Sequence, residues 1–136
     1  MAMPARYRDT LVERSEGRLV ATVDRADRCL LIYPLPDWEE IERKLMRLPT
    51  LNPQVRRLQR LMVGHATELE LDSHGRVLVP PKLREYASLT RQAMLIGQGS
   101  RFELWDEQHW NERRDAWLQV DEETGELPAE LGQLSL

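Results

Sequence analysis

Residues 64–86 read GHATELELDSHGRVLVPPKLREY, and the rest of the chain is organised around them. In residues 67–72 polar and apolar side chains alternate, which is the period of a strand with one buried and one solvated face. Gly75 follows three residues after Asp72, and a glycine there supplies the positive φ that a tight hairpin turn needs. The pattern predicts a hairpin with its tip at residues 73–75.

The residues after this turn predict a second strand and a short helix. Arg76 precedes the run VLV, which is rich in β-branched side chains. Two consecutive prolines end the strand, and the second of them suits the first position of a helix over residues 82–87. Arg76 is therefore expected beside the hairpin tip, with Lys82 and Arg84 nearby.

These residues resemble the signature of the MraZ family of transcriptional regulators. The matching positions are Asp72, Gly75, Arg76, Val79, Pro80, Leu83 and Arg84. Further runs also look like that family: YPLPDWE at 33–39, RRLQR at 56–60, GHATE at 64–68 and FELWD at 102–106. The resemblance covers nearly the whole chain. It implies an α+β fold of tandem swapped-hairpin (SpoVT–AbrB) β modules, with helices between and after them.

The chain also contains an internal repeat. MPARYRD at residues 3–9 aligns with VPPKLRE at residues 79–85, and Trp38 aligns with Trp110. The first copy begins at Met1, already past the strand and turn that precede Val79 in the second copy. We therefore expect an in-frame upstream extension that ends in a strand and an Asp-x-x-Gly-Arg turn, since a two-stranded remnant leaves unpaired edges.

From these patterns we predict four segments. An N-terminally incomplete first module takes residues 1–37, and a helical connector takes residues 38–64. The second module takes residues 66–109, and residues 110–136 form a C-terminal helix and an acidic tail. Within the connector, Asn52 and Pro53 predict the cap and the first position of a helix.

Composition limits the class of protein. With 136 residues and 41% hydrophobic side chains, the chain suits one compact domain or two small ones packed together. The net charge of −4 argues against a uniformly basic nucleic-acid binder but leaves room for a local basic surface. Cys29 is the one cysteine; it lies in an apolar run and is expected to be a buried side chain in a reducing cytoplasm. No apolar run reaches about 18 residues, so no membrane span is expected.

Two groups of basic residues are candidates for contact with DNA. The first comprises Arg76, Lys82 and Arg84, with Arg6 and Arg8 at the matching places of the first copy. The planar fork of arginine suits bidentate contact with a phosphate or a guanine edge, and a hairpin tip can reach into a groove. Asp72 either pairs with the Arg76 guanidinium across the turn or orients it, with Gly75 forming the turn.

The second group holds six basic residues and no acid: Arg43, Lys44, Arg47, Arg56, Arg57 and Arg60. It is either a phosphate-facing surface or a solvated helical face that pairs with acids nearby or on a neighbouring subunit. The apolar stripes of the same helices favour the second interpretation.

The sequence contains no pattern typical of catalysis or of a metal site. His65, His74 and His109 are scattered, with no carboxylate or cysteine at ligand spacing. Glu68 and Glu70 alternate on one strand face, as ordinary solvated side chains do. We predict no enzyme activity, no metal and no cofactor.

The resemblance implies a function with which these residues are compatible. It implies a repressor that binds double-stranded DNA at short direct repeats in the promoter of the division and cell-wall gene cluster, including its own operon. It also implies a ring-shaped homo-oligomer, in the cytoplasm and associated with the nucleoid, in which several subunits bind DNA by avidity. The alternative is an oligomeric protein-interaction scaffold of the antitoxin type.

Overall fold

The computed structural model describes residues 1–124 of the chain. It contains two compact units, Met1–Asp106 and a C-terminal unit that begins at Glu107. The described part of the second unit is one long helix, α5 (Glu107–Thr124). The sequence predicts an acidic tail, and the part of it beyond Thr124 lies outside the described residues. Within residues 1–124, no helix is both long and apolar enough to cross a membrane.

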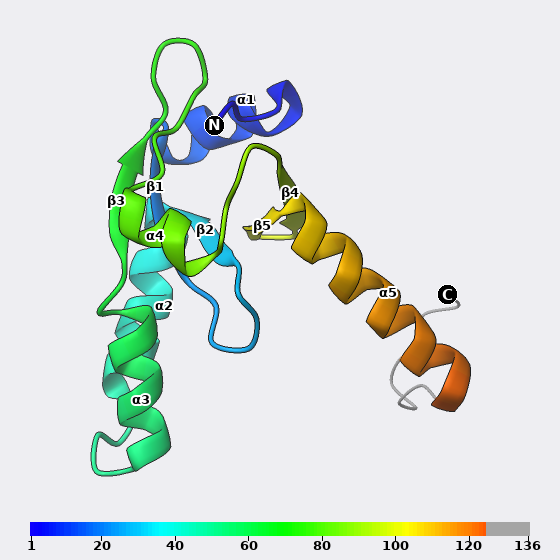
Figure 1. The fold of residues 1–136 in the computed structure, drawn as a ribbon. Coiled ribbons are helices and arrows are strands. Elements are labelled where there is room, and N and C mark those ends of the chain that lie inside the picture. Colours follow the sequence, from blue (N-terminus) through cyan, green and yellow to red (C-terminus); the bar gives the residue numbers. More distant parts are fainter. Residues whose placement is uncertain (125–136) are drawn as a thin grey trace, which may run out of the picture. The chain divides into compact units, whose positions relative to one another are not determined.

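The first unit is a mixed α+β structure built on one antiparallel sheet (Figure 1). Its elements are α1 (Ala5–Ser15), β1 (Arg18–Val23), β2 (Leu30–Pro34), α2 (Leu35–Arg47), α3 (Pro53–Met62), β3 (Thr67–Glu70), α4 (Pro81–Tyr86), β4 (Ala93–Gln98) and β5 (Arg101–Asp106). The five strands lie in the order β3-β1-β2-β5-β4. This confirms the α+β fold predicted from the sequence.

The two copies of the repeat share this sheet. Strands β1 and β2 form a hairpin in the first copy, and β4 and β5 form one in the second. Strand β2 pairs with β5, with Leu31 opposite Glu103. Strand β3 belongs to the second copy by sequence but pairs with β1, with Leu19 opposite Leu69. A strand of one copy thus completes the sheet of the other, as a swapped hairpin requires.

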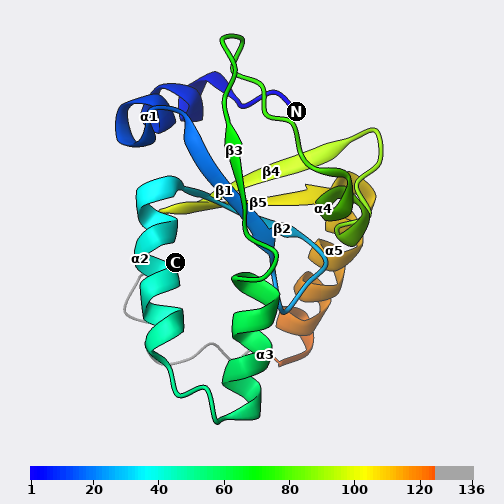
Figure 2. The ribbon, with the colours of Figure 1, turned by 90° about the vertical axis from the view of Figure 1, so that its left-hand side faces the viewer.

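Helices cover both faces of the central strands (Figure 2). Leu19 and Ile32 point to the face where α1 and α4 supply Leu11 and Leu83 to the core. The alternate residues, such as Tyr33, point to the other face, where α2 and α3 pack. All five residues of β2 are consequently buried. Burial on both faces explains why this strand reads as a continuous apolar run.

Local signals set the starts of two helices as the sequence predicts. The Asn52 side chain accepts a hydrogen bond from the Gln54 backbone N–H at 2.8 Å, and Pro53 takes the first position of α3. Helix α4 likewise begins with Pro81. Proline is favoured there because a first-turn residue has no intrahelical partner for its N–H group.

The second strand of the predicted hairpin is absent from this part of the structure. After Arg76, residues 77–80 adopt no regular strand. Arg76 instead makes a single bridge to Ala2, and the Val77 N–H donates to the Met1 carbonyl oxygen at 2.7 Å. Val77 and Val79 are buried in the core, so the β-branched residues mark packing against apolar neighbours here and not a strand ladder.

We expect Leu30→Ala to lower the free energy of unfolding by about 2–5 kcal/mol, because it opens a cavity in a fully buried strand. Leu78→Ala, at a side chain that is 82% exposed, should change it by no more than about 0.5 kcal/mol. Urea denaturation followed by tryptophan fluorescence measures both values. Equal effects of the two substitutions would contradict the assignment of the core.

Candidate nucleic-acid interface

The turn at residues 72–76 is held by the carboxylate of Asp72. Its Oδ1 accepts hydrogen bonds from the backbone N–H groups of His74 at 2.9 Å and Arg76 at 2.8 Å. The Gly75 N–H donates to the Asp72 carbonyl oxygen, and the Asp72 N–H donates to that of Arg76. Asp72 therefore binds the backbone of the turn and leaves the Arg76 guanidinium exposed.

The hydrogen bonds of the turn also affect the ionisation of the Asp72 carboxyl group. The Arg76 backbone N–H, as the largest cause, lowers the pKa of Asp72 below its ordinary value, and the His74 N–H adds to the effect. Hydrogen bonds to the ionised form of a carboxyl group stabilise that form. Asp72 is thus a charged acceptor at neutral pH and orients Arg76 through the main chain.

The start of the chain supports the same turn. The Met3 N–H donates to the Gly75 carbonyl oxygen at 2.8 Å, beside the bridge between Ala2 and Arg76. In Figures 1 and 2 the turn projects from the first unit beyond the end of β3, at the end of the unit opposite α2 and α3. The exposed Arg76 therefore stands on a protruding, hydrogen-bonded loop that residues of the first copy brace.

Arg6 and Arg8 lie in the first turns of α1, and they differ in their surroundings. Arg6 is exposed, and its guanidinium lies 4.7 Å from the centre of the Tyr7 ring. Arg8 is half-buried, and its guanidinium packs against Gly75. The structure therefore brings Arg8 to the turn that carries Arg76.

Lys82 and Arg84 are exposed on α4, but the structure does not bring Lys82 to the turn. Lys82 lines a pocket with His65 and Thr67 at the start of β3, whereas the turn follows the end of that strand. The chain between Arg76 and α4 runs back along the first unit as an extended segment (Figure 1). The expectation that Lys82 stands near the tip assumed that residues 77–79 continue the hairpin as a strand.

The second basic group lies on α2 and α3. Its members Arg43, Arg47, Arg56, Arg57 and Arg60 are exposed, and Lys44 forms an ion pair with Glu40 at 3.4 Å. The loop between the two helices carries Leu51, whose side chain is 93% exposed. This end of the unit therefore combines positive charge with an exposed apolar side chain.

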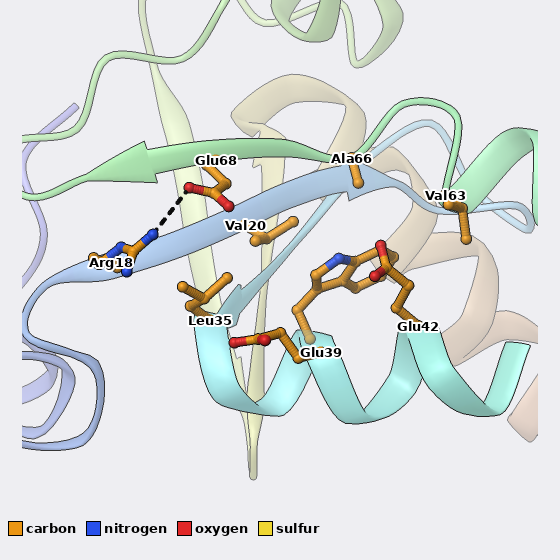
Figure 3. Close-up of a pocket in the computed structure, with 9 residues that line it drawn as sticks. Arg18, Val20, Leu35, Glu39, Glu42, Val63, Ala66 and Glu68 are labelled. Carbon is orange, nitrogen blue, oxygen red and sulfur yellow. Dashed lines mark hydrogen bonds and ion pairs between the residues drawn. The ribbon is translucent and has the colours of Figure 1, made fainter. Parts of the chain in front are cut away.

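A groove of about 400 Å³ lies between α2 and the strands β1 and β3 (Figure 3). Glu39 and Glu42 project from α2, and Glu68 faces them from β3, where it pairs with Arg18 at 3.3 Å. Three carboxylates against one guanidinium repel phosphate, so this groove suits a cationic partner and not DNA. The sequence offers one indication of this groove, because Glu39 and Glu42 lie three residues apart and therefore on the same helix face.

Three potential metal ligands also lie close together, with ligand atoms within 4.8 Å of one another: Asp24, Cys29 and Glu103. Burial, as the largest cause, and then the charge of Asp24 raise the pKa of the Cys29 thiol far above its ordinary value. The thiol donates to Asp24 Oδ2 at 3.5 Å, and Glu103 accepts from Trp105 Nε1 at 3.0 Å. A protonated thiol and an engaged carboxylate make poor ligands. The sequence did not indicate this cluster, because Glu103 comes from the other copy of the repeat.

Comparisons with known proteins agree with the repeat. A family model described as "MraZ protein, putative antitoxin-like" matches the chain twice, over residues 1–61 and 62–124. A relative from Thioalkalivibrio sulfidiphilus, named Transcriptional regulator MraZ, is 61% identical over 136 residues, which are all of this chain and 90% of the relative. Relatives of the same name from Halorhodospira halophila and Pseudomonas aeruginosa are 56% and 54% identical, again over all of this chain and 90% of each relative.

We expect Asp72→Ala to speed amide hydrogen exchange at His74 and Arg76, because both N–H groups lose their acceptor. Asp72→Asn, which keeps an acceptor oxygen but no charge, should have a smaller effect. In the unmodified chain, the stability that Asp72 contributes is complete above the ordinary pKa of 3.8 and is lost as pH falls through the lowered pKa of the folded state. Protection factors measured by NMR test both statements. Unchanged protection in Asp72→Ala would contradict this account of the turn.

Proposed function

Because the chain belongs to the MraZ family, we propose that it is a transcriptional regulator that binds specific sequences in double-stranded DNA. The observation that carries this proposal is the turn at residues 72–76, where a fixed backbone presents an exposed arginine. Among residues 1–124, none of the ion pairs includes the Arg76 guanidinium. Its fork is therefore open to a guanine edge or a phosphate.

A pre-formed turn favours recognition for an energetic reason. Ordering a loop on binding costs conformational entropy, and that cost is subtracted from the affinity. Here Asp72 and Met3 hold the backbone around Gly75 and Arg76 before DNA arrives. Arg76 is thus our first choice for the base or phosphate contact. Arg6, which is exposed in the first turn of α1, would add a further contact, and Lys82 and Arg84 would contact DNA farther from the tip.

The proposed target is the set of short direct repeats in the promoter of the division and cell-wall gene cluster, and the proposed effect is repression, including repression of the chain's own operon. One acidic subunit with a few basic contacts binds DNA weakly. Several subunits of a ring bind adjacent repeats with a combined affinity far above that of one contact. We place this complex at the nucleoid, in the cytoplasm.

Two surfaces of the first unit support ring assembly. The groove in Figure 3 is lined by three glutamates, Glu39, Glu42 and Glu68, together with Arg18 and several apolar side chains. The loop between α2 and α3 carries the exposed Leu51, with Arg56 and Arg57 nearby on α3. The first surface is acidic and the second is basic, so the two are complementary in charge and are not the same patch. An interface between unlike surfaces is heterologous, and such interfaces generate closed rings when the rotation closes.

The second candidate function is that of a protein-interaction scaffold of the antitoxin type. The same groove favours it, since a groove lined by three glutamates suits a cationic segment of another protein. In that case the groove would bind a foreign chain, and DNA binding would be weak and insensitive to the identity of residue 76. Catalysis has no support from the relatives, whose names describe regulators of transcription.

We predict that Arg76→Ala weakens binding to a promoter duplex by about 1–3 kcal/mol per contacting subunit if the fork reads a base edge. If Arg76 touches only phosphate, binding to promoter and random DNA should weaken alike, and the slope of log K against log salt should fall by about one per lost contact. Fluorescence anisotropy at several salt concentrations distinguishes these results.

Arg43→Ala, on the exposed face of α2, is the matched control, because it removes the same charge at the other end of the unit. Both variants must keep the oligomeric state of the unmodified chain, so that lost avidity is not mistaken for a lost contact. Unchanged binding by an intact Arg76→Ala oligomer would exclude the turn as the DNA-reading element. Loss of DNA binding in Arg43→Ala alone would place the DNA-binding site on α2 and α3.

For assembly, we predict that Glu42→Arg and Arg57→Glu each reduce the size of the oligomer, because each places like charges at the same interface. The combined variant should regain the ring, since it exchanges the two signs. Light scattering coupled to size-exclusion chromatography measures the mass. A monomeric unmodified chain at micromolar concentration would refute the ring, and failure of the combined variant to recover would refute this pairing of surfaces.

A further inference from the structure

We infer that Arg8 is a positioning residue for the turn that carries Arg76: its guanidinium braces Gly75 from the side of α1 and itself makes no contact with DNA. Only the expected effect of Arg8 on DNA binding rests on the proposed function. The brace itself is a statement about the folded chain. It changes the role expected of Arg8, which the sequence placed among the DNA contacts.

The first support is the closeness of the contact. A Cβ atom built on Gly75 would lie 2.0 Å from Nε of Arg8, 2.3 Å from Cζ and 2.6 Å from Nη2. The guanidinium therefore lies directly on the Cα of the glycine. Gly75 is buried although Asp72, His74 and Arg76 around it are all exposed. The Arg8 side chain covers the glycine on one side.

The second support is the hydrogen bonding around Arg8. Its Nη2 donates to the Met3 carbonyl oxygen at 3.3 Å, and the Met3 N–H donates to the Gly75 carbonyl oxygen at 2.8 Å. Arg8, Met3 and Gly75 thus form a closed set of contacts. The Nε of Arg8 is buried and has no hydrogen-bond partner. The edge of the fork that carries Nε and Nη2 therefore faces the turn and is not open to a phosphate.

The third support is the conformation of Gly75. Its φ is +72°, in the left-handed region that glycine adopts without steric cost. Two constraints therefore act at the same residue, the backbone angle and the space that the guanidinium occupies. Because Arg8 belongs to the first copy of the repeat and Gly75 to the second, the contact couples the position of α1 to the direction of Arg76.

The experiment compares Arg8→Ala and Arg8→Lys with the unmodified full-length chain, after light scattering and urea denaturation have compared assembly and stability. The ligands are a duplex of the promoter DNA upstream of the gene and a random duplex of equal length. We expect Arg8→Ala to weaken promoter binding about tenfold, within the range for a misplaced base contact, and to leave random DNA and the salt slope unchanged. Arg8→Lys should behave like Arg8→Ala, because an ammonium group cannot cover Gly75 as a flat guanidinium does.

Other results would overturn the inference. If Arg8 contacts phosphate directly, both duplexes should weaken alike in Arg8→Ala and the salt slope should fall by about one per subunit, and the same loss should occur in the Arg76→Ala background, where a brace has no arginine left to position. Full recovery in Arg8→Lys would likewise indicate that the positive charge alone matters. Should Arg8→Ala fail to fold, Arg8→Lys, which keeps the aliphatic stem, provides the same comparison.

A double-mutant cycle tests the contact without DNA. Amide exchange at Arg76 is measured in Gly75→Ala, Arg8→Ala and the combined variant. We expect Gly75→Ala to loosen the turn less in the Arg8→Ala background, because the added methyl group no longer meets the guanidinium. Additive effects would show that Arg8 and Gly75 act independently and would overturn the brace. A non-additive result in a chain that fails to bind promoter DNA would support the contact between Arg8 and Gly75 and would reject the proposed function.

Discussion

The pairing of β2 with β5 is the contact on which the rest of the first unit depends. It joins the β1–β2 hairpin to the β4–β5 hairpin, and neither hairpin alone could bury both of its faces. Once the strands form one sheet, β2 is buried throughout, and helices from both copies can cover it. The protruding turn depends on a second pairing, because β3 is anchored on β1 before the chain leaves the sheet.

Much of this fold could be predicted from local patterns. Asn52 and Pro53 mark the start of α3, and the apolar run before Tyr33 marks a buried strand, because caps and periodicity act over a few residues. Three features depend on contacts distant in sequence and could not be found in this way. These are the position of Lys82 beside the start of β3, the irregular path of residues 77–80, and the packing of Arg8 on Gly75.

The candidate interface shows why a basic residue does not predict its own role. From the sequence alone, Arg76 and Arg8 belong to the same group of basic residues expected to contact DNA. In the structure one guanidinium is exposed and the other is packed against a glycine. The difference comes from Asp72, which satisfies the backbone of the turn and leaves Arg76 unpaired with it, and from α1, which carries Arg8 into contact. Whether an arginine is open to a ligand or supports neighbouring residues depends on its burial and its hydrogen-bond partners, and not on its residue type.

The strand order has a consequence for how the chain folds during synthesis. Leu30 pairs with Leu104, and Arg18 pairs with Glu70, so the sheet of the first copy cannot close until most of the second has left the ribosome. Pairings between residues so far apart in sequence slow folding, since the loop entropy is lost before the contacts form. Until then the apolar strands β1 and β2 are exposed to other nascent chains. A polysome that translates this gene is therefore a place where one copy of the repeat can pair with the wrong partner.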